Sequence, residues 1–244
     1  MTETPTPDDP ETIDRDREIL RLEHHLREMT ELAVGMVADG TRALLTADTA
    51  LSQSVISRDA PLDRYDLNIE TETIRLVAVM QPEGPDLRTI EAILKIANSV
   101  DRIGRLGFDI ARYISDASLA SEEPGRMLAE MDRRARAMVQ EAIGALLARD
   151  AVKAKAVFAL DDDVDALYRQ VRQRLIELLR SGGAATERLV YLLLASRHLE
   201  RVADNACKIA EKTVYAITGE RRAEYLPPRP RGGPVSAGGS PSPP

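Results

Sequence analysis

The pattern of apolar and acidic residues in this chain occurs twice, and this duplication limits the folds that the chain can adopt. Ten residues of the first half are matched by an identical or similar residue 102 positions later. They are Met36, Val37, Ala43, Leu44, Leu45, Asp48, Asp59, Leu62, Asp63 and Ile74, matched by Met138, Val139, Ala145, Leu146, Leu147, Asp150, Asp161, Val164, Asp165 and Ile176. A repeat of this length indicates a duplicated structural unit.

Further along each half the offset becomes 99 positions. The matched residues there are Ile90, Ile93, Leu94, Val100, Arg102, Ile103, Ile110 and Ala111, which return as Leu189, Leu192, Leu193, Leu199, Arg201, Val202, Ile209 and Ala210. The change of offset falls between residues 81–86 and the shorter 181–184, as expected if loops absorb insertions that helices do not tolerate. We therefore predict two consecutive units, residues 13–118 and 121–219.

Within each unit the apolar residues step by three or four, which is the period of an amphipathic helix. Aromatic residues make up only 3% of the chain and there is no Trp, while Ala, Leu, Glu and Arg are abundant, a composition that favours an all-α fold. We expect a long first helix with a break near Gly35 or Gly40, a second over about 61–80 and a third over about 86–115. The prediction is two tandem three-helix bundles, six helices in all, packed side by side.

The alternative is a single irregular helical bundle in which the matches only reflect shared apolar spacing. Periodicity explains recurring apolar positions, but it does not explain the repeated acids Asp48/Asp150 and Asp59/Asp161. The duplicated plan is therefore preferred.

Both ends of the chain differ from its centre. Residues 1–12 have neither the basic start nor the apolar stretch of a secretion signal, and residues 220–244 are rich in Pro, Gly and Ser. We expect both to be disordered. No apolar run is long enough to span a bilayer, so we expect a cytoplasmic protein without direct membrane insertion that touches a membrane only through a partner.

The charge and cysteine content exclude several classes of protein. A net charge of −7 disfavours a nucleic-acid-binding function, since such proteins concentrate basic residues against phosphates. The single cysteine, Cys207, excludes an intramolecular disulfide, and it is expected to be a core residue. With only three histidines, any metal would be bound by oxygen ligands.

The most suggestive stretch lies in the last predicted helix, where Glu200 and Asp204 stand one turn apart. One interpretation is a surface salt-bridge lattice with the nearby Arg197, Arg201 and Lys208. The other is a pair of ligands for a hard cation. The Glu-x-x-His pattern of di-iron bundle enzymes is missing, which argues against an oxidative catalyst.

These residues carry a resemblance to a known family. The run from Arg197 to Asp204, followed by Ile209-Ala-Glu211, resembles the motif of the PhoU family of phosphate-signalling regulators, whose two repeats each contain a Glu/Asp-x-x-x-Asp sequence. A weaker copy begins at Val100-Asp101, and Gln81-Pro82 resembles the family's connection between helices two and three. The resemblance covers about residues 18–219.

The resemblance implies a non-enzymatic regulator of phosphate uptake and phosphate signalling. Such a protein would contact the ATPase of the phosphate ABC transporter and a sensor histidine kinase, and would hold the kinase in its repressing mode when phosphate is plentiful. It would form a homodimer. The family's motifs bind divalent or trivalent ions such as Fe, Zn, Mn or Mg, which implies Glu200 and Asp204 as ligands, with Asp101 and Asp109 as weaker ones.

The sequence departs from the family pattern at Arg105, which stands where the first motif should end in an acid. A positive charge there opposes a bound cation unless Arg105 points away and Asp109 substitutes. We therefore expect the two repeats to bind metal unequally. A carboxylate-bridged metalloprotein or enzyme, and a metal-free helical scaffold, remain as alternative functions.

The histidines are weaker candidates for a metal site. Adjacent side chains diverge by about 100° on a helix, so His24 and His25 are not expected to share a metal ion. His198 is expected to lie at the boundary of the core rather than to act as a ligand.

Overall fold

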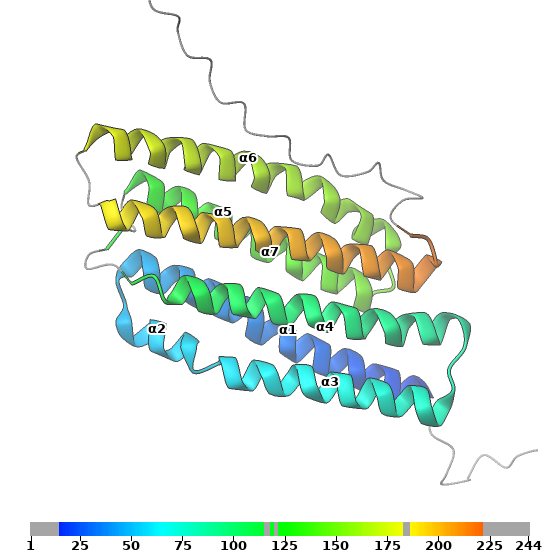
Figure 1. The fold of residues 1–244 in the computed structure, drawn as a ribbon. Helices are drawn as coiled ribbons and strands as arrows, with labels where there is room; N and C mark the ends of the chain where they lie inside the picture. The colour runs from blue at the N-terminus through cyan, green and yellow to red at the C-terminus, as the bar shows by residue number, and fades with distance from the viewer. Residues whose placement is uncertain (1–14, 115–117, 120–121, 183–185, 222–244) are drawn as a thin grey trace, which may run out of the picture.

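The computed structural model describes residues 15–114, 118–119, 122–182 and 186–221. Its regular elements, within those residues, are seven helices (Figure 1). They are α1 (Arg15–Thr46), α2 (Thr49–Ile56), α3 (Asp59–Met80), α4 (Gly84–Ala111), α5 (Glu123–Leu147), α6 (Ala151–Ser181) and α7 (Thr186–Thr218). The all-α prediction is confirmed.

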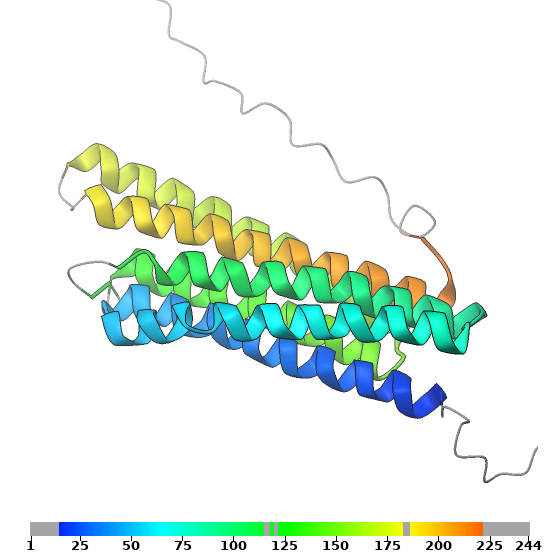
Figure 2. The ribbon, with the colours of Figure 1, turned by 60° about the horizontal axis from the view of Figure 1, so that its bottom comes forward.

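The helices form two three-helix bundles that lie side by side, as predicted. The first contains α1, α3 and α4, with the short α2 between α1 and α3, and the second contains α5, α6 and α7. Contacts of α1 with α5 and of α4 with α7 join the two bundles. In Figure 1, α3 and α6 lie on opposite outer flanks of the molecule, and in Figure 2 the cyan α3 comes to the front.

The repeated acids Asp48 and Asp150 stand at the starts of α2 and α6. The Asp48 carboxylate accepts a hydrogen bond from the Leu51 backbone N–H at 2.9 Å, and Asp150 accepts from Val152 and Lys153 at 3.0 and 2.9 Å. Such N-caps satisfy backbone donors that the first helical turn leaves unpaired. This part of the sequence repeat is thus a repeated helix start.

The second helix predicted over about 61–80 is confirmed as α3, but the short α2 that precedes it was not predicted, and the two helices are separated at Ser57 and Arg58. The physical reason is Pro61, whose ring would clash with the carbonyl of Ser57 and which has no N–H for a helical hydrogen bond. Pro61 is accommodated in the first turn of α3. The equivalent position 102 residues on is Asp163, and α6 runs through it without a break.

The first helix has no break, although one was expected near Gly35 or Gly40, because α1 continues to Thr46. The third helix ends at Ala111, before the predicted residue 115. Its last carbonyl, that of Ala111, accepts a hydrogen bond from Ser52 Oγ at 2.7 Å. The hydroxyl of α2 thus satisfies one of the backbone acceptors exposed where α4 ends.

A continuous apolar core runs through both bundles, with members from α1, α4, α5 and α7. Leu26, Ile96, Met131 and Leu199 are among its fully buried side chains. Cys207 is buried in the same core, as predicted. This shared core, rather than a mobile linker, holds the repeats together.

Several predictions fall outside the described residues or remain untested. The expected disorder of residues 1–12, and of all but the first two residues of 220–244, lies outside the part of the chain that the structure describes. The domain boundaries at 13–118 and 121–219 stay a prediction. Among the described helices, none is long and apolar enough to cross a membrane.

Candidate functional site

Each bundle carries acidic residues where its second and third helices meet. In the second bundle these are Glu200 and Asp204 of α7 with Asp165 of α6. Burial raises the pKa of Glu200, and the neighbouring carboxylates of Asp204 and Asp165 raise it further. We call these three residues the second carboxylate group.

Glu200 is largely enclosed, with only 15% of its side chain exposed. Its Oε2 is buried and accepts no hydrogen bond from the described residues, while Oε1 contacts the Arg197 guanidinium one turn earlier. Lys208, predicted as a partner of Asp204, donates to Asn205 Oδ1 at 3.2 Å. Part of the predicted salt-bridge lattice therefore exists, and one buried carboxylate oxygen lies outside it.

In the first bundle the position equivalent to Asp204 holds Arg105. The Arg105 side chain points into the acidic residues around it. Nε donates to Asp101 Oδ2 at 2.9 Å, within α4. Nη2 and Nη1 reach Asp63 and Asp59 of α3 at 2.5 and 3.5 Å. The condition under which Asp101 would bind metal, that Arg105 points away, is not met.

Two further acids belong to these surroundings: Asp66, on which the charge of Arg105 acts, and Glu70, whose charge acts on Asp66. Burial raises the pKa of Asp66, and the nearby charges of Asp101, Glu70 and Asp63 add to this, whereas Arg105 acts in the opposite direction. We call Asp59, Asp63, Asp66, Glu70 and Asp101 the first carboxylate group. It is crowded with negative charge, and Arg105 provides the balancing positive charge.

Asp109, the fourth predicted ligand, has different neighbours from Asp101. Eight residues along an α-helix correspond to about 12 Å of rise and a turn of about 80°. The charge of Asp109 acts on Tyr113 and on His198 of α7, where the two bundles meet. The structure thus brings Glu200 and Asp204 together, but it places Asp109 apart from Asp101.

His198 is partly buried at the boundary of the core, as expected, and it lies where α7 of the second bundle meets the first. Its Nε2 is 3.0 Å from the Tyr113 hydroxyl, and its ring stacks on Tyr113, which also stacks on Tyr191. Burial lowers the pKa of His198. The ring therefore serves as a packing and hydrogen-bonding group between α7 and Tyr113, which follows the end of α4.

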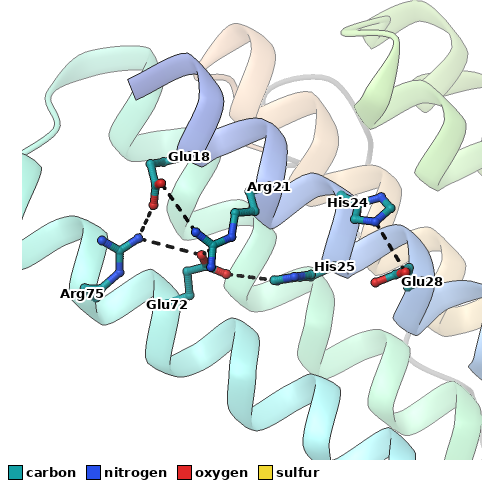
Figure 3. A network of polar contacts seen from close by, with 7 residues as sticks. All are labelled: Glu18, Arg21, His24, His25, Glu28, Glu72 and Arg75. Atoms are coloured by element: carbon teal, nitrogen blue, oxygen red, sulfur yellow. Dashed lines mark hydrogen bonds and ion pairs between the residues drawn. The ribbon is translucent and has the colours of Figure 1, made fainter. Parts of the chain in front are cut away.

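His24 and His25 interact with different carboxylates, in agreement with their predicted divergence (Figure 3). His25 Nδ1 lies 3.0 Å from Glu72 Oε2 of α3, and His24 Nε2 lies 3.4 Å from Glu28. Glu72 is buried and also pairs with Arg21 and Arg75. The network fastens the start of α1 to α3.

The described residues contain no ready-made cluster of three His, Cys, Asp or Glu side chains arranged to hold a metal ion. The contributions of Asp63 and Asp165 from the neighbouring helices were not assigned from sequence. The signal was present, since both belong to the pairs repeated at an offset of 102. Only the packing of α3 on α4 and of α6 on α7 shows that they join the motif residues.

The fold and these groups together define a class of protein: a duplicated three-helix-bundle protein with a carboxylate-bearing motif at equivalent places in each repeat. The family model described as "PhoU domain" matches this chain twice, over residues 26–114 and 128–213. The chain belongs to the PhoU family.

Relatives and solved structures agree with this assignment. The "Phosphate-specific transport system accessory protein PhoU homolog" of Rhizobium meliloti is 33% identical over 84% of this chain and 87% of its own length. That of Pseudomonas aeruginosa is 32% identical over 80% and 81%. Crystal structures of PhoU from Pseudomonas aeruginosa and of the phosphate transport system regulatory protein PhoU from Streptococcus pneumoniae each superpose with a TM-score of 0.77. Their identities are 30% and 25%, and they cover 84% and 85% of this chain and 99% of each solved chain.

Proposed function

We propose that this chain is a cytoplasmic, non-enzymatic regulator of phosphate uptake that acts as an accessory protein of a phosphate-specific transport system. The observation that carries the proposal is the match of both halves of the chain to the PhoU domain. The relatives that bear the accessory-protein name align over most of their own length, so the similarity covers the whole duplicated architecture.

In its finer form, the proposed role is that of an adaptor. The chain would bind the ATPase of the phosphate ABC transporter and a sensor histidine kinase, and would keep the kinase repressing when phosphate is plentiful. Exposed apolar side chains on the outer helix α3 support such binding, since Leu67 and Ile74 are 60% and 61% exposed. They lie seven residues apart and so share one face of the helix.

Deleting the gene and measuring phosphate-starvation transcripts in phosphate-rich medium tests the regulatory role. We expect the transcripts to rise in the deletion strain and to fall when the gene is restored. Transcripts that stay silent in the deletion strain would count against it. Co-purification of the tagged chain with the ATPase and the kinase tests the adaptor role, with Leu67→Asp as the variant expected to weaken binding and Val152→Asp, on the opposite flank, as its control.

We also propose that the second carboxylate group binds a divalent or trivalent ion. Oxygen donors suit a hard cation such as Mn²⁺ or Mg²⁺, and the buried Glu200 Oε2 that accepts no hydrogen bond is a suitable ligand atom. Asp204, one turn along α7, would share the ion with Glu200, and water would supply the remaining ligands. A bound cation would offset the repulsion between these two carboxylates and the nearby charge of Asp165.

Metal analysis of protein purified without chelator tests this site. We expect the Glu200→Gln/Asp204→Asn double variant to lose metal that the unchanged protein retains. Asp162→Asn, an exposed change on α6, is the control and should retain it. Equal metal content in all three proteins would overturn the proposed site.

A homodimer is the proposed oligomeric state. Sedimentation of the purified chain should give twice the mass of one chain. A species with the mass of one chain across the accessible concentration range would contradict it.

A further inference from the structure

Arg105 stands at a motif position that is occupied by an acid, Asp204, in the second repeat. The offset of 99 positions pairs Asp101 with Glu200 and Arg105 with Asp204. The two motifs therefore share their first carboxylate and differ by two units of charge at their second position. This difference lies at the centre of the first carboxylate group.

The guanidinium of Arg105 spreads its N–H groups over three carboxylates from two helices. Nε donates a hydrogen bond to Asp101 on α4, while Nη2 and Nη1 donate to Asp63 and Asp59 on α3, at the distances given above. An arginine side chain keeps its charge at every physiological pH and has five donors in a fixed plane. It can therefore bridge several carboxylates as a metal ion would, without depending on supply from solution.

The local packing brings these carboxylates within reach of Arg105. A Cβ atom on Gly104 would lie 2.4 Å from Leu62 Cδ2, so the Leu62 side chain of α3 packs directly on the backbone of α4 at Gly104. Asp59 and Asp63 lie on either side of Leu62 in the α3 sequence. In the second repeat the residue equivalent to Gly104 is Ala203. The packing of Leu62 on Gly104 and the bridging arginine thus occur together in the first repeat.

We infer that Arg105 is a built-in cation that replaces a metal ion in the first repeat, so that α3 is held on α4 without metal and the first motif does not bind one. A cation approaching Asp101 would meet a fixed positive charge and carboxylates already engaged with it. Arg105 has this role whether or not the second repeat binds a metal ion. The chain therefore contains one metal-independent repeat.

Titration with Mn²⁺ tests this role on the unchanged protein first. Paramagnetic broadening of amide NMR signals should leave the residues around Asp101 unaffected at Mn²⁺ concentrations that broaden signals in Arg105→Asp. That variant restores an acid at the second position of the motif, and it should bind one more Mn²⁺ per chain than the unchanged protein. Adding Asp101→Asn to Arg105→Asp should abolish the gain.

The matched control is Arg102→Asp, which makes the same change of charge at an exposed position of α4 next to the motif. It should not gain a Mn²⁺ ion. Hydrogen exchange of α3 gives a second measurement: it should speed up in Arg105→Asp without metal and slow again with Mn²⁺, and it should not respond to Mn²⁺ in the unchanged protein.

If Arg105→Asp is too unstable to purify, Arg105→Gln removes the charge without adding another acid, and it should also gain Mn²⁺ binding that depends on Asp101. Two results would overturn the inference. One is Mn²⁺ broadening around Asp101 in the unchanged protein. The other is a folded Arg105 variant that gains no Mn²⁺, since Arg105 would then not be what excludes the ion. If the second repeat binds no metal, the Mn²⁺ titration and the hydrogen exchange of α3 still test the role of Arg105.

Discussion

Gly40 of α1 and Gly107 of α4 touch through their backbones. A Cβ atom on Gly40 would lie 2.5 Å from the carbonyl oxygen of Gly107, and one on Gly107 would lie 2.6 Å from the backbone of Met36 and Val37. Neither position has room for a methyl group. The equivalent positions in the second repeat are Ala142 and Ala206, so this contact at the α1–α4 crossing belongs to the first bundle alone.

We predict that Gly107→Ala destabilises the protein by about 2–3 kcal/mol, because the neighbouring atoms belong to backbone that cannot move aside without shifting α1. The control is Gly144→Ala in α5, where an added Cβ meets nothing within 4 Å. That change should stabilise the helix by about 0.5–1 kcal/mol. Chemical denaturation measures both, and shifts of the same sign in the two variants would contradict the close approach.

The N-cap of α6 provides a second prediction. Asp150→Ala removes the acceptor for the Val152 and Lys153 N–H groups and should cost about 1 kcal/mol of unfolding free energy. Asp150→Asn retains an acceptor oxygen and should cost only a small part of this. Hydrogen exchange should place the loss in the first turn of α6. Equal losses in the Ala and Asn variants would show that the side chain does not act as a cap.

A third prediction concerns pH. Burial raises the pKa of Asp132 in α5, where the side chain is almost fully enclosed, and the hydrogen bonds from Arg136 only partly oppose this. The folded protein therefore holds the Asp132 proton more tightly than the unfolded chain does. The associated stability is complete below the unfolded pKa and is lost as pH rises through the folded pKa.

Asp132→Asn has no such titration, so its stability relative to the unchanged protein should rise as pH increases from about 4. Urea denaturation at a series of pH values measures the difference, and the exposed Asp162→Asn serves as a control that should show no such trend. A variant whose relative stability falls with rising pH would refute the assignment.

The duplicated plan was predictable from sequence because helix-packing residues must recur in register, while an insertion between α3 and α4 only changes the offset from 102 to 99. The start of the second helix was also predictable, because Pro61 favours the first turn of a helix and α3 begins at Asp59. The pattern alone did not reveal that residues 49–56 form a separate helix.

The candidate site was only half predictable. Glu200 and Asp204 lie four residues apart on one helix, so their proximity follows from helix geometry. The approach of Asp165, and of Asp59 and Asp63 in the other repeat, depends on how neighbouring helices pack. The direction of the Arg105 side chain depends on the same packing, and sequence left it open. The repeated acids do not all have the same role. Asp48 and Asp150 are helix caps, whereas Asp63 and Asp165 belong to the two carboxylate groups.

The central claim, that this chain restrains phosphate uptake, is tested most directly by measuring the uptake of labelled phosphate in cells that lack its gene. In phosphate-rich medium we predict faster uptake than in the parent strain, with the parental rate restored when the gene is returned. Uptake equal to that of the parent strain in both phosphate-rich and phosphate-poor medium would contradict the account.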